Sequence, residues 1–146
     1  MSAAGRYVVS ETRVIPADRQ RLFDVVADPS MHPRIDGSGT VIAPVPGAPE
    51  RLGPGVRFGM SMRMGLPYRT PNRVVEFEEG HLIAWAHFSR NVWRWEFADV
   101  EGGTRVTESF DWSRARVRPV MRRFATGNAA SMRRSLEKLE RLVAEG

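Results

Sequence analysis

The chain has 146 residues, a formal net charge of +5 and no cysteine. The length suits one ordinary domain, so we expect a single domain over residues 1–146. Without cysteine there is no disulfide, thiol nucleophile or thiolate metal site, and this composition fits the cytoplasm. No apolar run approaches the ~20 residues of a membrane span, and no apolar segment follows Arg6 as in a signal peptide.

The positive charge raises the question of a nucleic-acid partner. Lys138 is the only lysine, and the arginines are scattered over the whole chain instead of forming one stripe. We therefore expect no nucleic-acid partner. The three dispersed histidines do not suit a zinc site, and neither a phosphate-binding glycine loop nor a dinucleotide fingerprint occurs, so we expect no metal and no cofactor.

The first third of the chain predicts one strand followed by short helices. Residues 6–14 are rich in β-branched and aromatic types, which is typical of a strand. Asp18 suits the start of a helix over residues 19–27, which ends before Pro29 because the residue preceding a proline avoids the helical conformation. The same part of the chain is expected to contain a helical turn at 31–35, a brief strand at 40–43 and a proline-rich loop at 44–55.

Alternation of apolar and polar residues dominates the middle of the chain. It is clearest over residues 56–64, where every second residue is apolar and arginines lie between them. Such a period of two indicates a strand with one face in a core and the other in water. Turns, most of them containing glycine, separate four more runs of this kind. These further strands are expected over residues 68–78, 82–88, 92–98 and 104–112.

The period changes to that of a helix over about residues 116–144. Between Val117 and Leu142, mostly apolar residues follow one another at spacings of three and four, which predicts one largely apolar stripe along the helix. Gly127 lies in the middle of this helix and so predicts close packing or a kink. A meander of so many strands must curl, and this helix is the one element large enough to cover its apolar face.

Several stretches of sequence carry a resemblance to a known family. They are VVADP (residues 25–29), HPRIDGSGTV (32–41), VVEF (74–77), IAW (83–85) and GGTRVTE (102–108). With these stretches the chain resembles the START-like, or SRPBCC, superfamily, and in particular the actinobacterial proteins labelled polyketide cyclase/dehydrase. The resemblance implies an α+β helix-grip fold, in which a seven-stranded antiparallel sheet wraps a long C-terminal helix and two short helices follow the first strand. It also implies a ligand cavity between the concave face of the sheet and the long helix.

Apolar and aromatic side chains are expected to line such a cavity, together with a few polar groups. Methionine adapts to irregular ligands, and aromatic rings supply a large contact area. The same side chains also suit an ordinary filled core, in which no cavity would remain. The candidate ligand-binding residues are Met60, Met62, Met64, Tyr68, Trp85, Trp95, Phe97, Phe110, Trp112, Met121, Phe124 and Asn128.

Glu108 and His87 are the candidates for chemistry, although the sequence holds no convincing catalytic set. Glu108 falls in phase with the inward-facing Val106 and Phe110, where a carboxylate is costly unless it is paired or protonated. It either anchors a ligand or transfers a proton, or else it pairs with an arginine or points outward, and we favour the second interpretation. His87 could act as a base, but a hydrogen bond from its ring to a neighbouring backbone group is the more common role for such a histidine, and we favour it.

The expected function is the binding of a small hydrophobic ligand, whether lipid-like, polyketide or polycyclic, by a carrier or sensor. The alternative is a polyketide cyclase or dehydratase that uses the same cavity. A third hypothesis is an interaction protein whose core is filled. The ligand, the oligomeric state and the role of residues 44–55 as a lid stay open at this point.

Overall fold

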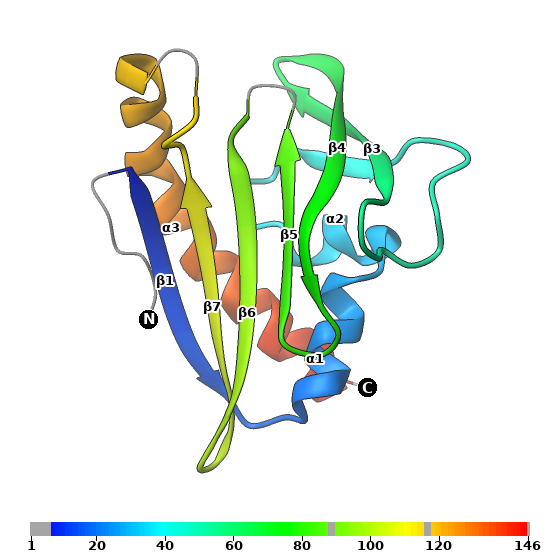
Figure 1. Cartoon of the computed structure of the whole chain (residues 1–146), viewed down its shortest axis with the longest axis vertical. Coiled ribbons are helices and arrows are strands. Elements are labelled where there is room, and N and C mark those ends of the chain that lie inside the picture. The colour runs from blue at the N-terminus through cyan, green and yellow to red at the C-terminus, as the bar shows by residue number, and fades with distance from the viewer. Residues whose placement is uncertain (1–6, 88–89, 116–117, 146) are drawn as a thin grey trace.

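An antiparallel sheet with helices on one of its sides makes up the fold (Figure 1). The computed structural model describes residues 7–87, 90–115 and 118–145, and within the last helix it leaves aside the side chains at 120, 121, 123, 124 and 126. The elements are β1 (Val8–Ile15), α1 (Arg19–Val26), the 3-10 helix η1 (Pro29–Met31), α2 (His32–Ile35), β2 (Val41–Pro44), β3 (Arg57–Met64), β4 (Leu66–Glu78), β5 (Leu82–His87), β6 (Val92–Val100), β7 (Gly103–Asp111) and α3 (Arg118–Glu145).

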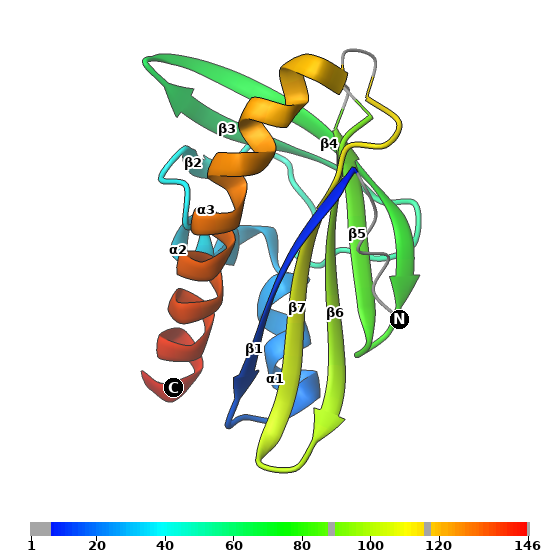
Figure 2. The same cartoon turned by 90° about the vertical axis from the view of Figure 1, so that its left-hand side faces the viewer.

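The seven strands form one sheet in the order β1-β7-β6-β5-β4-β3-β2, with every neighbouring pair antiparallel. Strands β2 to β7 follow one another along the chain, and β1 returns to pair with β7. Figure 2 shows α1 and α3 on the same, concave side of the sheet. The predicted α+β helix-grip architecture is confirmed, and most predicted strand ends differ from the observed ones by one or two residues.

Strand β4 contains an irregularity that the alternation of the sequence conceals. Its register with β5 shifts between Val74 and Glu76. Val74 is buried and Val75 is 49% exposed, so the inward-facing set changes phase here before Phe77. A bulge of this kind bends a strand and increases its twist. It therefore allows β4 to follow the curvature of the sheet around the helices.

Contacts from both ends of the chain hold α3 against the sheet. Glu140 accepts a hydrogen bond from Arg13 Nε on β1 at 2.6 Å, and Arg133 forms an ion pair with Glu11 at 3.2 Å. The backbone of the turn after α2 also packs directly against the helix. A Cβ placed on Gly37 would be 2.0 Å from the Ser131 carbonyl oxygen. Only a glycine fits this approach.

Two hydrogen bonds fix the turn at Gly37. Its N–H donates to Ser135 Oγ at 2.9 Å, and its carbonyl accepts from Arg134 Nε at 2.8 Å. Of the two alternatives predicted at Gly127, close packing is wrong, since this glycine is exposed and a Cβ there would meet no described atom outside its own stretch of helix within 4 Å. The helix thus has its tight contact at the Ser131–Ser135 turn.

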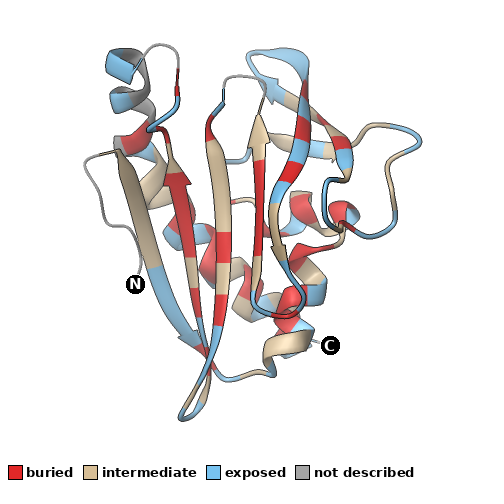
Figure 3. Cartoon of the chain, in the orientation of Figure 1, coloured by how far each residue is buried: buried red, intermediate tan, exposed pale blue. Residues whose placement is uncertain are grey.

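Buried residues occur on the strands and on the helices, as the red segments of Figure 3 show. At the α1 end Phe23 is fully buried, and its ring meets Phe77 and Phe97 edge-on at centroid distances of 5.6 and 5.5 Å. Edge-on aromatic pairs add to the hydrophobic gain of burial. Among the described residues no helix is long and apolar enough to cross a membrane.

Candidate ligand cavity

A cavity of about 560 Å³ lies between the concave face of the sheet, the segment from α2 to β2 and α3. Its apolar lining residues are Ile35, Val41, Phe58, Met60, Met62, Met64, Trp85, Trp93, Trp95, Phe110 and Met132. Its polar lining residues are His32, Asp36, Ser38, Thr40, Tyr68, Thr70, Asn72, His87, Asn91, Glu108, Asn128, Ser131 and Ser135. A partly open cavity of this size argues against the hypothesis of a filled core.

Most of the residues selected from the sequence lie around this cavity. The ten that line it are Met60, Met62, Met64, Tyr68, Trp85, His87, Trp95, Glu108, Phe110 and Asn128. Met121 and Phe124 fall on side chains outside the described residues. Whether any of them touches a ligand stays a prediction.

Phe97 and Trp112 share the inward phase of their strands but do not line the cavity. Phe97 lies at the α1 end of β6, where Phe23 fills the adjacent space. Trp112 follows the end of β7 and packs edge-on against Tyr7 at a centroid distance of 5.0 Å. Alternation identifies the face of a strand correctly, but it does not show how far along that face the cavity extends.

Glu108 lies on the wall formed by the sheet, between Glu11 of β1 and Trp95 of β6 in register. It is 5% exposed, and its Oε1 has no hydrogen-bond partner among the described residues. The favoured prediction of an arginine partner or an outward orientation is therefore wrong. Burial, and secondarily the negative charge of Asp36, raise the pKa of the Glu108 carboxyl well above its usual range.

The acidic neighbours of Glu108 are already engaged elsewhere. Glu11 pairs with Arg133, as described above. The Asp36 carboxylate accepts hydrogen bonds from the backbone N–H groups of Ser38 and Val41, both at 3.1 Å. Both neighbours are acids, so neither could neutralise an ionised Glu108. The described lining also contains no lysine or arginine, although the chain has 22 such residues.

His87 and Asn72 form a second polar group on the wall, where they face each other across β4 and β5. Burial lowers the pKa of His87 to about 4, so its imidazole is neutral at physiological pH. The expected hydrogen bond from its ring to a backbone group is not found among the described residues, and the ring instead lies edge-on to Trp93 at 6.4 Å. Asn72 donates from Nδ2 to the Thr70 carbonyl at 3.1 Å, which leaves its buried Oδ1 without a partner.

His32 lines the cavity from the α2 side and plays a structural role. Its Nε2 lies 2.8 Å from the Val26 carbonyl oxygen, which only accepts, so Nε2 carries the proton. The ring stacks on Trp85 at a centroid distance of 4.9 Å, and burial lowers its pKa. A histidine held neutral in this way orients the Trp85 indole that forms part of the cavity wall.

Phe58, Thr70, Asn72 and Ser131 line the cavity but were not predicted from the sequence. Phe58 continues the phase of Met60 and was open to prediction. Asn72 is in phase with Tyr68 and Val74 and was also open to prediction, because the bulge in β4 changes the phase only beyond Val74. Within the described part of the chain no group of three or more histidine, aspartate or glutamate side chains is placed to hold a metal ion.

Comparison with solved structures shows the same fold in other bacterial proteins. A protein of Rhodobacter sphaeroides superposes with a TM-score of 0.76 at 16% identity, over 97% of this chain and 94% of its own. Protein Ms6760 of Mycobacterium smegmatis gives a TM-score of 0.73 at 19% identity, over 95% and 92% of the two chains. An AHSA1-like protein of Aeromonas hydrophila gives 0.64 at 18% identity, over 89% and 92%. At these identities the likeness concerns the fold alone.

Sequence comparison finds a nearer relative. The uncharacterised protein Rv0088 of Mycobacterium tuberculosis is 38% identical over 151 residues, a match that covers 98% of this chain and 67% of the relative. The model of the family described as polyketide cyclase/dehydrase and lipid transport matches residues 6–144. With that match over almost its whole length, the chain belongs to the polyketide cyclase/dehydrase and lipid transport family.

Proposed function

We propose that the protein binds a small hydrophobic ligand in the cavity, as a carrier or sensor in the cytoplasm. The observation that carries the proposal is a partly open cavity, lined largely by aromatic rings and methionines, in which Asn72 and Glu108 have polar atoms without a partner among the described residues. Protein interiors are otherwise close-packed, and their buried polar groups are nearly always hydrogen-bonded. A ligand with an apolar body and a polar group would correct both departures.

The volume suits a ligand of moderate size. Small-molecule sites commonly measure about 300–1,000 Å³, and the cavity of about 560 Å³ falls within this range. Liquid water takes about 30 Å³ per molecule, so the space corresponds to a ligand as bulky as roughly 19 waters. Polycyclic compounds and medium-length acyl chains meet this condition.

A cyclase or dehydratase is the second candidate, and one observation favours it. Burial raises the pKa of the Glu108 carboxyl and lowers that of His87 to about 4, so in one cavity burial favours the protonated form of an acid and the neutral form of a base. Opposite shifts of this kind are characteristic of acid–base pairs in enzymes. The register places the Trp85–Trp93–Phe110 row of the wall between the two groups, so an elongated substrate would contact both.

The test of the proposed function is saturable binding of a neutral hydrophobic probe. N-phenyl-1-naphthylamine, whose fluorescence rises in apolar surroundings, should bind the wild type with one site per chain. Asn128→Trp should weaken this binding at least tenfold, because the larger ring would enter the cavity from α3. The matched control is Val75→Trp, which adds the same ring on the exposed side of the β4 bulge and should leave the affinity unchanged.

Native mass spectrometry of the purified protein complements the probe. A bound compound of a few hundred daltons that is released on unfolding would identify the ligand class directly. A wild type that neither carries a compound nor binds the probe saturably would contradict the proposed function.

A further inference from the structure

Glu108 is the starting point, because its surroundings determine its chemical form. The side chain is buried, and Asp36 adds negative charge nearby. The described lining offers no lysine or arginine as a counter-ion. An isolated carboxylate in such a place costs several kcal/mol, and a group in this situation becomes neutral instead. Glu108 is then a carboxylic acid with one O–H donor.

No partner for that donor is found in the part of the chain that the structure describes. Oε1 of Glu108 has no hydrogen-bond partner among the described residues, although the side chain lines the cavity. The cross-strand neighbour Trp95 and the in-phase Phe110 present aromatic surface beside it. A ligand atom that meets Glu108 is therefore a hydrogen-bond acceptor carried by an apolar skeleton.

We propose that the O–H group of Glu108 donates a hydrogen bond to the carbonyl oxygen of a neutral ligand, so that the cavity selects ketones, esters or quinones over carboxylates. This inference rests on the proposed function and deepens it, because it names the ligand class and the residue that determines it.

The charges facing the cavity favour a neutral carbonyl over the other polar end groups. A ligand carboxylate would meet Asp36 and Glu108 with no basic partner in the described lining, and both His32 and His87 are neutral. A ligand ammonium placed at Glu108 would require this carboxyl to ionise. A carbonyl oxygen requires neither a basic partner nor the ionisation of Glu108. A hydrogen bond from a carboxylic acid to a carbonyl is also strengthened in surroundings of low dielectric constant.

Four compounds that share a naphthalene skeleton test the inference by calorimetry at pH 7. They are 2-acetylnaphthalene, the hydrocarbon 2-ethylnaphthalene, 2-naphthoate and 1-(2-naphthyl)ethylamine. The ketone should bind the wild type about tenfold more tightly than the hydrocarbon and the carboxylate, as one additional buried hydrogen bond implies.

Three variants separate the hydrogen bond from a structural role. Glu108→Gln keeps an N–H donor of the same shape and should keep the preference for the ketone. Glu108→Leu has no donor and should bind ketone and hydrocarbon equally. Glu11→Gln is the matched control, because Glu11 faces Glu108 across β1 and β7 but does not line the cavity. It should leave the preference unchanged.

Infrared spectroscopy reports on the bond itself. The carbonyl stretch of 13C-labelled 2-acetylnaphthalene should shift to lower frequency in the wild type and in Glu108→Gln, and less so in Glu108→Leu. A change in packing alone would not reproduce this order.

The outcomes separate the inference from the proposed function. Equal binding of ketone and hydrocarbon by the wild type, or a preference that survives in Glu108→Leu, would overturn the inference and leave hydrophobic binding intact. An amine that binds most tightly and is lost in Glu108→Gln would also overturn it, in favour of an ionised Glu108. If none of the four compounds binds, the proposed function fails as well.

Discussion

The two ends of the concave face of the sheet differ in packing: side chains fill one end, and a cavity lies at the other. At the α1 end, Phe23 fills the space in front of the sheet and contacts Phe77 and Phe97. At the other end the corresponding space is the cavity, with Glu108 on its wall and no side chain of the described residues paired with it. The sheet is continuous between them, so the difference lies in the side chains.

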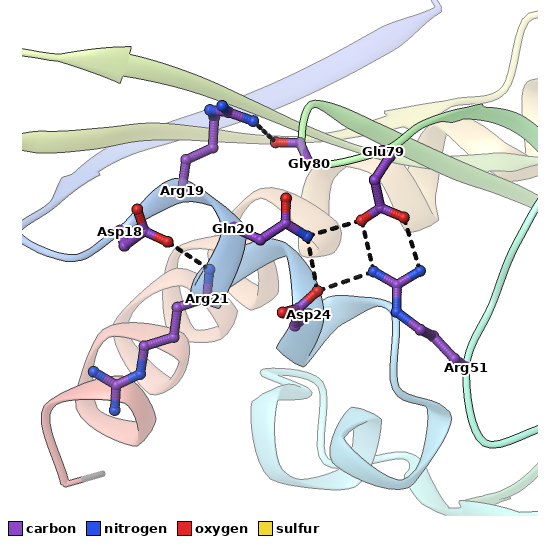
Figure 4. A network of polar contacts seen from close by, with 8 residues as sticks. All are labelled: Asp18, Arg19, Gln20, Arg21, Asp24, Arg51, Glu79 and Gly80. Atoms are coloured by element: carbon purple, nitrogen blue, oxygen red, sulfur yellow. Dashed lines mark hydrogen bonds and ion pairs between the residues drawn. The ribbon is translucent and has the colours of Figure 1, made fainter.

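The charged groups follow the same division. At the α1 end Arg51 bridges Asp24 at 2.9 Å and Glu79 at 2.7 Å, and Gln20 donates to both carboxylates (Figure 4). Hydrogen bonds from Arg51 and then from Gln20 lower the pKa of Glu79. Glu79 and Glu108 are the same type of side chain with opposite pKa shifts, because Glu79 accepts hydrogen bonds from Arg51, whereas Glu108 is buried and has no cationic partner among the described residues. The paired charges at the α1 end are what a stable fold requires. A buried, unpaired carboxyl such as Glu108 does not stabilise the fold, and this points to a role in the cavity.

The largest expected effect comes from emptying the filled end. Phe23→Ala should lower the free energy of unfolding by about 3–5 kcal/mol, the usual loss when a buried phenylalanine is replaced by alanine and a cavity remains in its place. Met62→Ala, which enlarges a cavity that already exists, should cost clearly less. Chemical denaturation of both variants measures the difference. Equal losses would show that the two ends do not differ in packing.

A pH series compares Glu108 with its uncharged analogue. Since the folded-state pKa of Glu108 is raised, its favourable contribution is complete below about pH 4.5, the ordinary value, and is lost as the pH rises through the raised value. Glu108→Gln removes this dependence, so its stability relative to the wild type should increase with pH. The increase should approach about 1.4 kcal/mol per pH unit within the window.

Denaturation of both proteins from pH 4 to pH 9 provides the measurement. His32 and His87 have lowered pKa values and act in the opposite sense, since their contribution is lost as the pH falls below about 6.5. Both proteins contain these histidines, so their effect cancels in the difference. Parallel curves would mean that Glu108 is paired and ionised.

The smallest effect is expected at the paired charges. Arg51→Ala should reduce stability by only about 0–1 kcal/mol, because half-exposed ion pairs are screened by water and salt. The same variant should raise the pKa of Glu79 toward its usual value, which an NMR titration of the carboxyl resonance can follow. A loss above about 2 kcal/mol would place this network among the main sources of stability and weaken the contrast with Glu108.

The sequence was sufficient for the fold and for much of the cavity wall. Strict alternation at Met60, Met62 and Met64, and again at Trp95, Glu108 and Phe110, identifies the inward face because strand geometry has a period of two. The same rule fails at Phe77, where the bulge at Val75 has shifted the phase set by Asn72 and Val74 and no glycine or proline at the bulge signals the change.

The partner of an inward-facing charge is beyond what periodicity can supply. Glu11 and Glu108 both face the concave side, directly opposite each other, and among the described arginines one pairs with Glu11 and none with Glu108. That difference depends on where Arg133 comes to lie on α3. The extent of the cavity depends in the same way on Phe23 and Tyr7, which cover Phe97 and Trp112 from other elements.

The close approach at Gly37 gives the long helix a fixed point. The backbone of the turn touches the Ser131–Ser135 segment of α3, and hydrogen bonds hold it from both directions. The helix cannot slide or retreat at this point without breaking those contacts. Any change in the capacity of the cavity must therefore come from the opposite wall, or from the part of α3 that precedes Ser131. The contact at Gly37 therefore sets the distance between α3 and the turn after α2, and with it one dimension of the cavity.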